Sequence, residues 1–189
     1  DPYVITVGAL NTNRTPGDWS DDTVLSWSAS GPTYDGFIKP DVLAPGTMVY
    51  SLLYNQMAFP DKTASLALQH PDYQEDQSFY HLSGTSVAAA VTSGVVAQLL
   101  QKFPTLTPTD IKQRLVRTAF SDITTDGELR ETVFRQGAGR VWAPDALTIS
   151  STLTSTANIG LNVEAELATP GINYQDSDSA NPQAVSYTH

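Results

Sequence analysis

The stretch His81-Leu-Ser-Gly-Thr-Ser-Val-Ala-Ala-Ala-Val-Thr-Ser-Gly-Val-Val-Ala-Gln-Leu-Leu-Gln101 decides the fold of this chain. Its first residues could close a strand, Gly84 marks a turn, and a largely apolar helix is expected to follow with Ser86 in its first turn. Unpaired N–H groups and the helix dipole favour negative charge at such a position. A serine nucleophile and its oxyanion would be stabilised there. The alternative interpretation is that Ser86 only caps the helix, as most serines before an apolar run do.

Four other segments accompany this serine turn along the chain. In order, they are Pro2-Tyr-Val-Ile-Thr-Val-Gly-Ala9, Ser28-Ala-Ser-Gly-Pro-Thr33, Lys39-Pro-Asp-Val-Leu-Ala-Pro-Gly46 and Gly137-Ala-Gly-Arg-Val-Trp-Ala-Pro-Asp-Ala-Leu147. Together with Ser83-Gly-Thr-Ser-Val-Ala-Ala-Ala-Val-Thr-Ser-Gly94, they resemble the subtilisin-like serine protease family over about residues 2–147. Two positions depart from the family pattern: Ala90 stands where a proline is usual, and Val91 where a histidine is frequent.

The resemblance implies an α/β fold, a truncated subtilisin-like three-layer arrangement with parallel strands and a central helix that starts at Ser86. Residues 1–148 would form the C-terminal half of such a catalytic domain. Beyond them the sequence becomes rich in serine and threonine and then polar. We therefore expect residues 149–189 to form a C-terminal extension that is partly disordered.

The resemblance also implies a serine endopeptidase, which hydrolyses peptide bonds through an acyl-enzyme, with Ser86 as the nucleophile. The Ser86 N–H and the Thr85 hydroxyl would donate to the oxyanion, and Gly84 would position the turn. In the family, the catalytic aspartate and histidine and the oxyanion asparagine come from segments before the strand that here begins at Tyr3. None of the three matches a residue of this chain. We therefore expect a polypeptide substrate and a companion segment that carries the missing residues.

A serine hydroxyl needs a base, and histidine is the usual one. The chain has three histidines: His189 at its end, His70 beside a proline, and His81 five residues before Ser86. Because side chains alternate between the faces of a strand, His81 is expected to point across the sheet rather than over the serine. Two alternatives stay open. One is a weak serine esterase that uses Ser86 alone or with His81, and the other is a non-catalytic assembly module in which Ser86 only caps a helix.

The composition is that of one globular domain, with 189 residues of which 40% are hydrophobic and 16% charged. A net charge of −10 disfavours nucleic acid and anionic membranes as partners. The chain has no cysteine, which excludes disulfides and thiol catalysis. The apolar run from Val87 to Leu100 is too short and too rich in small residues to span a bilayer. We recognise no signal segment at Asp1, and by the resemblance we expect a secreted, extracellular protein.

Asp41 is a weak candidate for a metal ligand. In relatives, the aspartate of Lys-Pro-Asp can help carbonyls of the preceding strand, here around Asp1 and Val4, to hold a weak cation. Oxygen ligands suit calcium or sodium, and a capped turn is the alternative. Asp176 and Asp178 lack the glycine and downstream glutamate of a calcium loop. We expect no required cofactor, and at most a weakly bound calcium or sodium ion.

The remaining pattern predicts the other elements. Strands are expected over Tyr3–Val7, Val24–Ser28 and Met48–Leu53, a helix after a cap at Thr107, and a last short helix over Trp142–Leu147. Residues 55–77 show no clear period and are interpreted as a surface insertion. A half-domain would leave a sheet edge unpaired, so we expect association with the N-terminal half of the domain or self-association.

Overall fold

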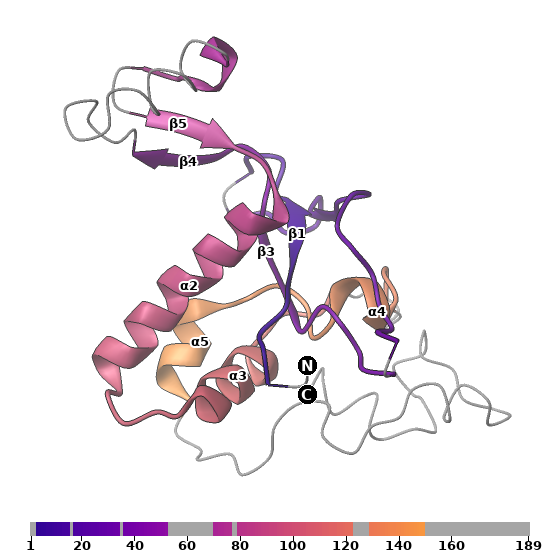
Figure 1. Ribbon diagram of the computed structural model, residues 1–189, viewed down its shortest axis with the longest axis vertical. Coiled ribbons are helices and arrows are strands. Elements are labelled where there is room, and N and C mark those ends of the chain that lie inside the picture. Colours follow the sequence, from indigo (N-terminus) through magenta and orange to yellow (C-terminus); the bar gives the residue numbers. More distant parts are fainter. Residues whose placement is uncertain are drawn as a thin grey trace, which may run out of the picture.

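The structure of the chain is a computed structural model that describes residues 3–15, 17–34, 36–52, 70–76, 79–122 and 129–149. The expected C-terminal extension, with Asp176, Asp178 and His189, lies outside the described residues, as does most of the expected insertion. Figure 1 shows a small sheet with helices on either side and a hairpin that projects from it.

A parallel pair of short strands forms the centre of the fold. β1 (Val7–Asn11) and β3 (Val42–Pro45) run parallel, with Gly8 opposite Leu43. β2 (Thr23–Val24) adds a short antiparallel strand to the other edge of β1. Parallel strands with helices beside them confirm the expected α/β class.

The strand bounds differ from the expected ones. β1 begins at Val7 rather than Tyr3, because the N–H of Thr6 is taken by the Asp41 carboxylate at 2.7 Å. The second strand is only two residues long, because the chain turns back at Ser28, whose N–H donates to the carbonyl of the residue three before it at 3.0 Å. An apolar pattern alone does not distinguish a strand from an extended segment that bonds to side chains.

Hydrogen bonds outside the strand ladders flank the β1–β3 pair on both sides. On the β1 side, Ala9 accepts from the N–H of Leu25 at 3.1 Å and donates to the Ser28 hydroxyl oxygen at 3.0 Å. On the β3 side, Leu43 exchanges two backbone hydrogen bonds of 2.8 Å with residues 139–141. The β1–β3 pair therefore has further partners at Ala9 and Leu43, and association with an N-terminal half or with a second copy of the chain stays a prediction.

The long helix α2 (Thr85–Lys102) packs on one face of the sheet, as Figure 1 shows. Its Ala88 forms a buried cluster with Ala9 of β1 and Ala44 of β3. Three small side chains let the helix approach the strands closely. The helix is unbroken at Ala90, so the departure from the family's proline leaves its first turns regular.

Three shorter helices complete the described fold: α3 (Pro108–Arg117), α4 (Val133–Gln136) and α5 (Ala143–Thr148). α3 begins with the expected capping box, in which the Thr107 hydroxyl accepts from the Asp110 N–H and the Asp110 carboxylate accepts from the Thr107 N–H. The main core lies between these helices, the far end of α2 and β3. It consists of Ile38, Val42, Leu99, Ile111, Leu115, Val116, Val133, Ala138 and Ala146.

A two-stranded hairpin projects beyond the N-terminal end of α2 (Figure 1). β4 (Val49–Leu52) pairs antiparallel with β5 (Phe79–Leu82), which places Tyr50 opposite His81. The 3₁₀ helix η1 (Pro71–Tyr73) lies against β5. β5 leads directly into the turn before α2, as the sequence predicts. Among the described helices, none combines the length and the apolar character that a membrane crossing requires.

Candidate active site

Two of the family-like segments meet where β3 and β5 end. The N–H of Gly84 donates to the carbonyl of Gly46 at 2.8 Å. Position 46 has no room for a side chain, since a Cβ there would lie 2.6 Å from the Cβ of Ala9 and 3.1 Å from the Gly84 carbonyl oxygen. Glycine at position 46 therefore allows the end of β3 to approach the turn before α2.

Ser86 is the second residue of α2, and its side chain is exposed. The N–H groups of Val87 and Ala88 both donate to the Gly84 carbonyl at 3.1 Å. The N–H groups of Thr85 and Ser86 have no acceptor among the described residues, and the Ser86 hydroxyl has no partner there either. The predicted nucleophile thus lies open beside two unused backbone donors, an arrangement suited to stabilise an oxyanion.

Ser83 lies three residues before Ser86 and has a different role. Its hydroxyl oxygen accepts the N–H of Met48 at 2.9 Å. Met48 has a positive φ of 47°, which is uncommon for a residue other than glycine. The Ser83 hydroxyl thus fixes the chain between β3 and β4, whereas the hydroxyl of Ser86 has no partner among the described residues.

His81, the alternative base, lies inside the hairpin. Its ring centroid is 5.8 Å from that of Tyr50 and 6.2 Å from that of Tyr73. Its Nδ1 lies 3.9 Å from a carboxylate oxygen of Glu75 and accepts no hydrogen bond from the part of the chain that the structure describes. These partners belong to the hairpin and to the segment of η1 beside it, and no described contact joins His81 to Ser86. The geometry therefore adds no support to the esterase hypothesis.

Asp41, the weak metal candidate, is fully buried among ammonium groups. Lys39 Nζ lies 2.7 Å from its Oδ2 and Lys112 Nζ lies 2.9 Å from its Oδ1. The Thr6 N–H also donates to Oδ2 at 2.7 Å. Both ammonium groups donate to the Val4 carbonyl, at 2.9 Å and 3.0 Å. Because lysines occupy the oxygens that a cation would need, the geometry favours an ion cluster over a metal ion at Asp41.

Lys112 is the member of this cluster that the sequence analysis missed. Its side chain is 1% exposed, and burial lowers the pKa of Lys112 to about 8 although the Asp41 carboxylate opposes the change. The available signal is its position on α3, since Lys112 lies three and four residues before the buried Leu115 and Val116 and therefore next to them on the helix surface. Within the described ranges, no group of three or more His, Asp or Glu side chains is placed to hold a metal ion.

An exposed serine at the start of a helix that packs on parallel strands resembles the nucleophile turn of serine hydrolases. Comparison with known proteins identifies the family within this class. A family model described as the subtilase family matches residues 2–139. The chain belongs to the subtilase family.

Two curated relatives match this chain over part of its length. Serine protease AprX of Bacillus subtilis (strain 168) is 43% identical over 112 residues, which are 59% of this chain and 24% of that protein. Mycosin-4 of Mycobacterium tuberculosis is 35% identical over 120 residues, which are 63% of this chain and 21% of that protein. The chain thus spans about a quarter or less of the length of these relatives.

Solved structures show the same fold. Fervidolysin from Fervidobacterium pennivorans, a keratinolytic enzyme related to subtilisin, matches with a TM-score of 0.54 and 26% identity over 79% of this chain and 19% of that one. MycP1 from Mycobacterium smegmatis matches with a TM-score of 0.50 and 28% identity over 80% of this chain and 31% of that one. The described elements therefore form part of a subtilisin-like fold.

Proposed function

We propose that this chain supplies the nucleophile of a subtilisin-like serine endopeptidase. The observation that carries the proposal is the exposed Ser86 hydroxyl beside the unused N–H groups of Thr85 and Ser86. Membership of the subtilase family and 43% identity to a protein named serine protease AprX support it.

The chemistry follows from this geometry. Ser86 Oγ forms a bond to the carbonyl carbon of the peptide while a base removes its proton. The negative charge on the carbonyl oxygen is stabilised by the Ser86 N–H, the Thr85 hydroxyl and the positive end of the α2 dipole. The base then gives its proton to the leaving amine, and water releases the acyl group from Ser86. These steps require no cofactor.

In this proposal, the base, its aspartate partner and the oxyanion asparagine come from the N-terminal half of the domain. α2 supports a companion of this kind, because only Ala88, Thr92 and Leu99 of its 18 residues are buried although many are apolar. Leu100, on the same helix, is 39% exposed. A polypeptide that covers α2 would remove this apolar surface from water. A second copy of the chain would cover it as well, so self-association is the alternative.

The proposed endopeptidase activity implies a polypeptide substrate. We also propose that the protein is secreted and acts outside the cell, where a chain without cysteine is unaffected by oxidising conditions.

A peptide-hydrolysis assay tests the proposal, using this chain joined to the polypeptide encoded before Asp1. We expect hydrolysis that falls about 10⁶-fold in kcat in Ser86→Ala, because the nucleophile is lost. Ser93→Ala is the matched control, since Ser93 is another exposed serine of α2 and its hydroxyl only donates to a backbone carbonyl. Full activity in Ser86→Ala, or no hydrolysis by the folded protein, would contradict the proposal.

A further inference from the structure

Arg14 lies at the edge of the sheet that meets the turn before α2. β1 ends at Asn11 and β3 ends at Pro45, and because the two strands run parallel, their carboxyl ends lie side by side. Arg14 follows the end of β1 by three residues, and Met48 follows the end of β3 by three. Ligands of open parallel sheets bind at this edge. The segments after both strands are therefore placed to meet a bound substrate.

A series of contacts joins Arg14 to the turn that carries the nucleophile. Its Nη2 donates to the thioether sulfur of Met48 at 3.1 Å. The N–H of Met48 donates in turn to the Ser83 hydroxyl oxygen at 2.9 Å, and Ser83 lies three residues before Ser86. Since three residues span at most about 10 Å, these contacts place the Arg14 guanidinium within roughly 20 Å of the Ser86 hydroxyl.

The backbone on both sides of this contact is strained. Among the described residues other than glycine, only Asn13, Arg14 and Met48 have a positive φ, with values of 47°, 59° and 47°. Each such conformation costs free energy, and residues that adopt it cluster at sites that bind ligands or react. The strain is therefore concentrated where the side chains of Arg14 and Met48 meet.

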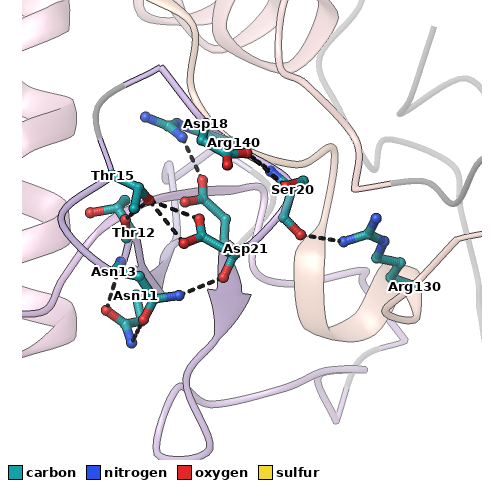
Figure 2. Close-up of polar contacts among 10 residues, drawn as sticks. Asn11, Thr12, Asn13, Thr15, Asp18, Ser20, Asp21, Arg130 and Arg140 are labelled. Carbon is teal, nitrogen blue, oxygen red and sulfur yellow. Dashed lines mark hydrogen bonds and ion pairs between the residues drawn. The ribbon is translucent and has the colours of Figure 1, made fainter.

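The residues on either side of Arg14 are held in place by side-chain hydrogen bonds, which Figure 2 shows. The N–H of Asn13 donates to the side-chain oxygen of Asn11 at 3.1 Å, and Asn13 Nδ2 donates to the Asp21 carbonyl at 2.6 Å. The Thr15 hydroxyl donates to the Asp21 carboxylate at 2.9 Å. These bonds maintain the strained turn, so the Arg14 side chain extends from a fixed backbone.

The positive charge of Arg14 is exposed and forms no ion pair with the described residues, although the chain has a net charge of −10. Its guanidinium lies 5.8 Å from the ring centroid of Tyr50, and its one described hydrogen bond goes to a thioether, which is a weak acceptor. The Glu75 carboxylate instead accepts from the Tyr50 hydroxyl at 3.3 Å. Most of the five N–H donors of Arg14 therefore remain available to a ligand.

We propose that Arg14 selects peptide substrates that carry an acidic side chain near the scissile bond, an inference that rests on the proposed function of Ser86. The guanidinium donates two N–H groups to a glutamate or aspartate carboxylate of the bound peptide. The Tyr50 ring and the Met48 sulfur hold the guanidinium in position. Because an extended peptide spans about 3.3 Å per residue, the acidic residue lies within about six positions of the scissile bond.

Pairs of fluorogenic peptides test this preference on the chain joined to the polypeptide encoded before Asp1. The two peptides of a pair carry glutamate or glutamine at one position and are otherwise identical, and that position is moved along about six residues on either side of the scissile bond. At one position or two neighbouring positions, we expect kcat/KM to be about three- to tenfold higher for the glutamate peptide. The ratio should fall at high salt, which screens the charges.

Arg14→Gln should reduce this ratio to about one, because the substrate carboxylate loses its charged partner. Arg117→Gln is the matched control and should leave the ratio unchanged. Arg117 is an exposed arginine at the end of α3, which lies far from the hairpin in Figure 1. Since each ratio compares two peptides on the same protein, it does not depend on how much of a variant folds.

Three results would overturn the role of Arg14 while hydrolysis at Ser86 continues. They are a ratio near one at every position, a preference that Arg14→Gln retains, and a ratio that falls equally in Arg117→Gln. If the folded protein hydrolyses no peptide of either kind, the proposed function is wrong and the role of Arg14 is wrong with it.

Discussion

The two ends of β3 hold polar groups in opposite ways. Immediately before the strand, the buried Asp41 carboxylate has Lys39, Lys112 and the Thr6 N–H within 2.7–2.9 Å. At the other end, a glycine contact leads to the start of α2, where the Ser86 hydroxyl lies exposed with no described partner.

The difference separates groups that hold the fold from groups that are available for chemistry. Buried charges that are paired with opposite charges fix the elements that carry them. Asp41 thereby joins the segment before β1 to β3 and α3. Unpaired groups at a helix start contribute little to folding, but they can bind a negative charge as it develops.

Removing the charge at Asp41 should have the largest effect on stability. Asp41→Asn leaves two buried ammonium groups without a carboxylate, and we expect the free energy of unfolding to fall by about 3–5 kcal/mol. Urea denaturation measures this change. Asp72→Asn, at an exposed carboxylate of η1, is the control and should change stability by less than about 0.5 kcal/mol. A small effect at Asp41 would show that the cluster does not hold the fold.

A side chain at position 46 should lower both the stability of the fold and the reactivity of Ser86. Gly46→Ala places a methyl group 2.6 Å from the Cβ of Ala9, so the strand end and the α2 turn must separate. We expect a loss of about 1–3 kcal/mol in stability, together with slower reaction of Ser86. Gly94→Ala is the control, because position 94 on α2 has open space around it. Unchanged reactivity of Ser86 in Gly46→Ala would contradict the inference that the close approach of the β3 end positions the turn before α2.

Lys112 gives the ion cluster a pH dependence. Its pKa is lowered to about 8, so between about pH 8 and 10.4 the unfolded chain binds more protons at this group than the folded chain. This group's contribution to stability therefore rises with pH across that window. At pH 7, the free energy of unfolding of Lys112→Met should lie within about 1 kcal/mol of that of the unaltered chain. Towards pH 10, the free energy of unfolding of the unaltered chain should rise by roughly 2 kcal/mol relative to that of Lys112→Met.

Chemical denaturation at several pH values measures that gap. Lys102→Met is the control, since Lys102 is exposed at the end of α2. A gap that is constant from pH 7 to 10 would mean that Lys112 is not held at a lowered pKa.

Ser86→Ala should have the smallest effect on stability. The hydroxyl has no described partner, and alanine favours the first turn of a helix as well as serine does within about 0.5 kcal/mol. Thermal unfolding measures the change. A loss above 1 kcal/mol would favour the interpretation that Ser86 is a structural cap.

The helices were the most predictable part of the fold, because their signals are local. The sequence from Thr107 to Asp110 carries a complete capping box, and the apolar run after Ser86 gives α2. β3 is too short to recognise alone, since its strand character depends on pairing with β1. α4 was not expected, because four residues are too few to show a helical period.

The charged contacts are not predictable from the sequence, because they join residues that are far apart in the chain. Asp41 was noticed within its motif, but its pairing with Lys112 joins two segments that are far apart in the chain. Asp22 lies at the end of a polar stretch that starts at Asn11, and its partner Arg140 is 118 residues away in the chain. Such pairs follow from tertiary packing, which one sequence does not reveal.

Reaction with a fluorophosphonate, followed by mass-spectrometric mapping of the modified residue, tests the central claim most directly. We predict modification at Ser86 in the chain joined to its N-terminal half and little or none in the chain alone, because the base is then missing. Ser93 should stay unmodified in both. Modification spread over several serines, or no modification at Ser86 when both halves are present, would contradict the claim that the hydroxyl at the start of α2 is a nucleophile.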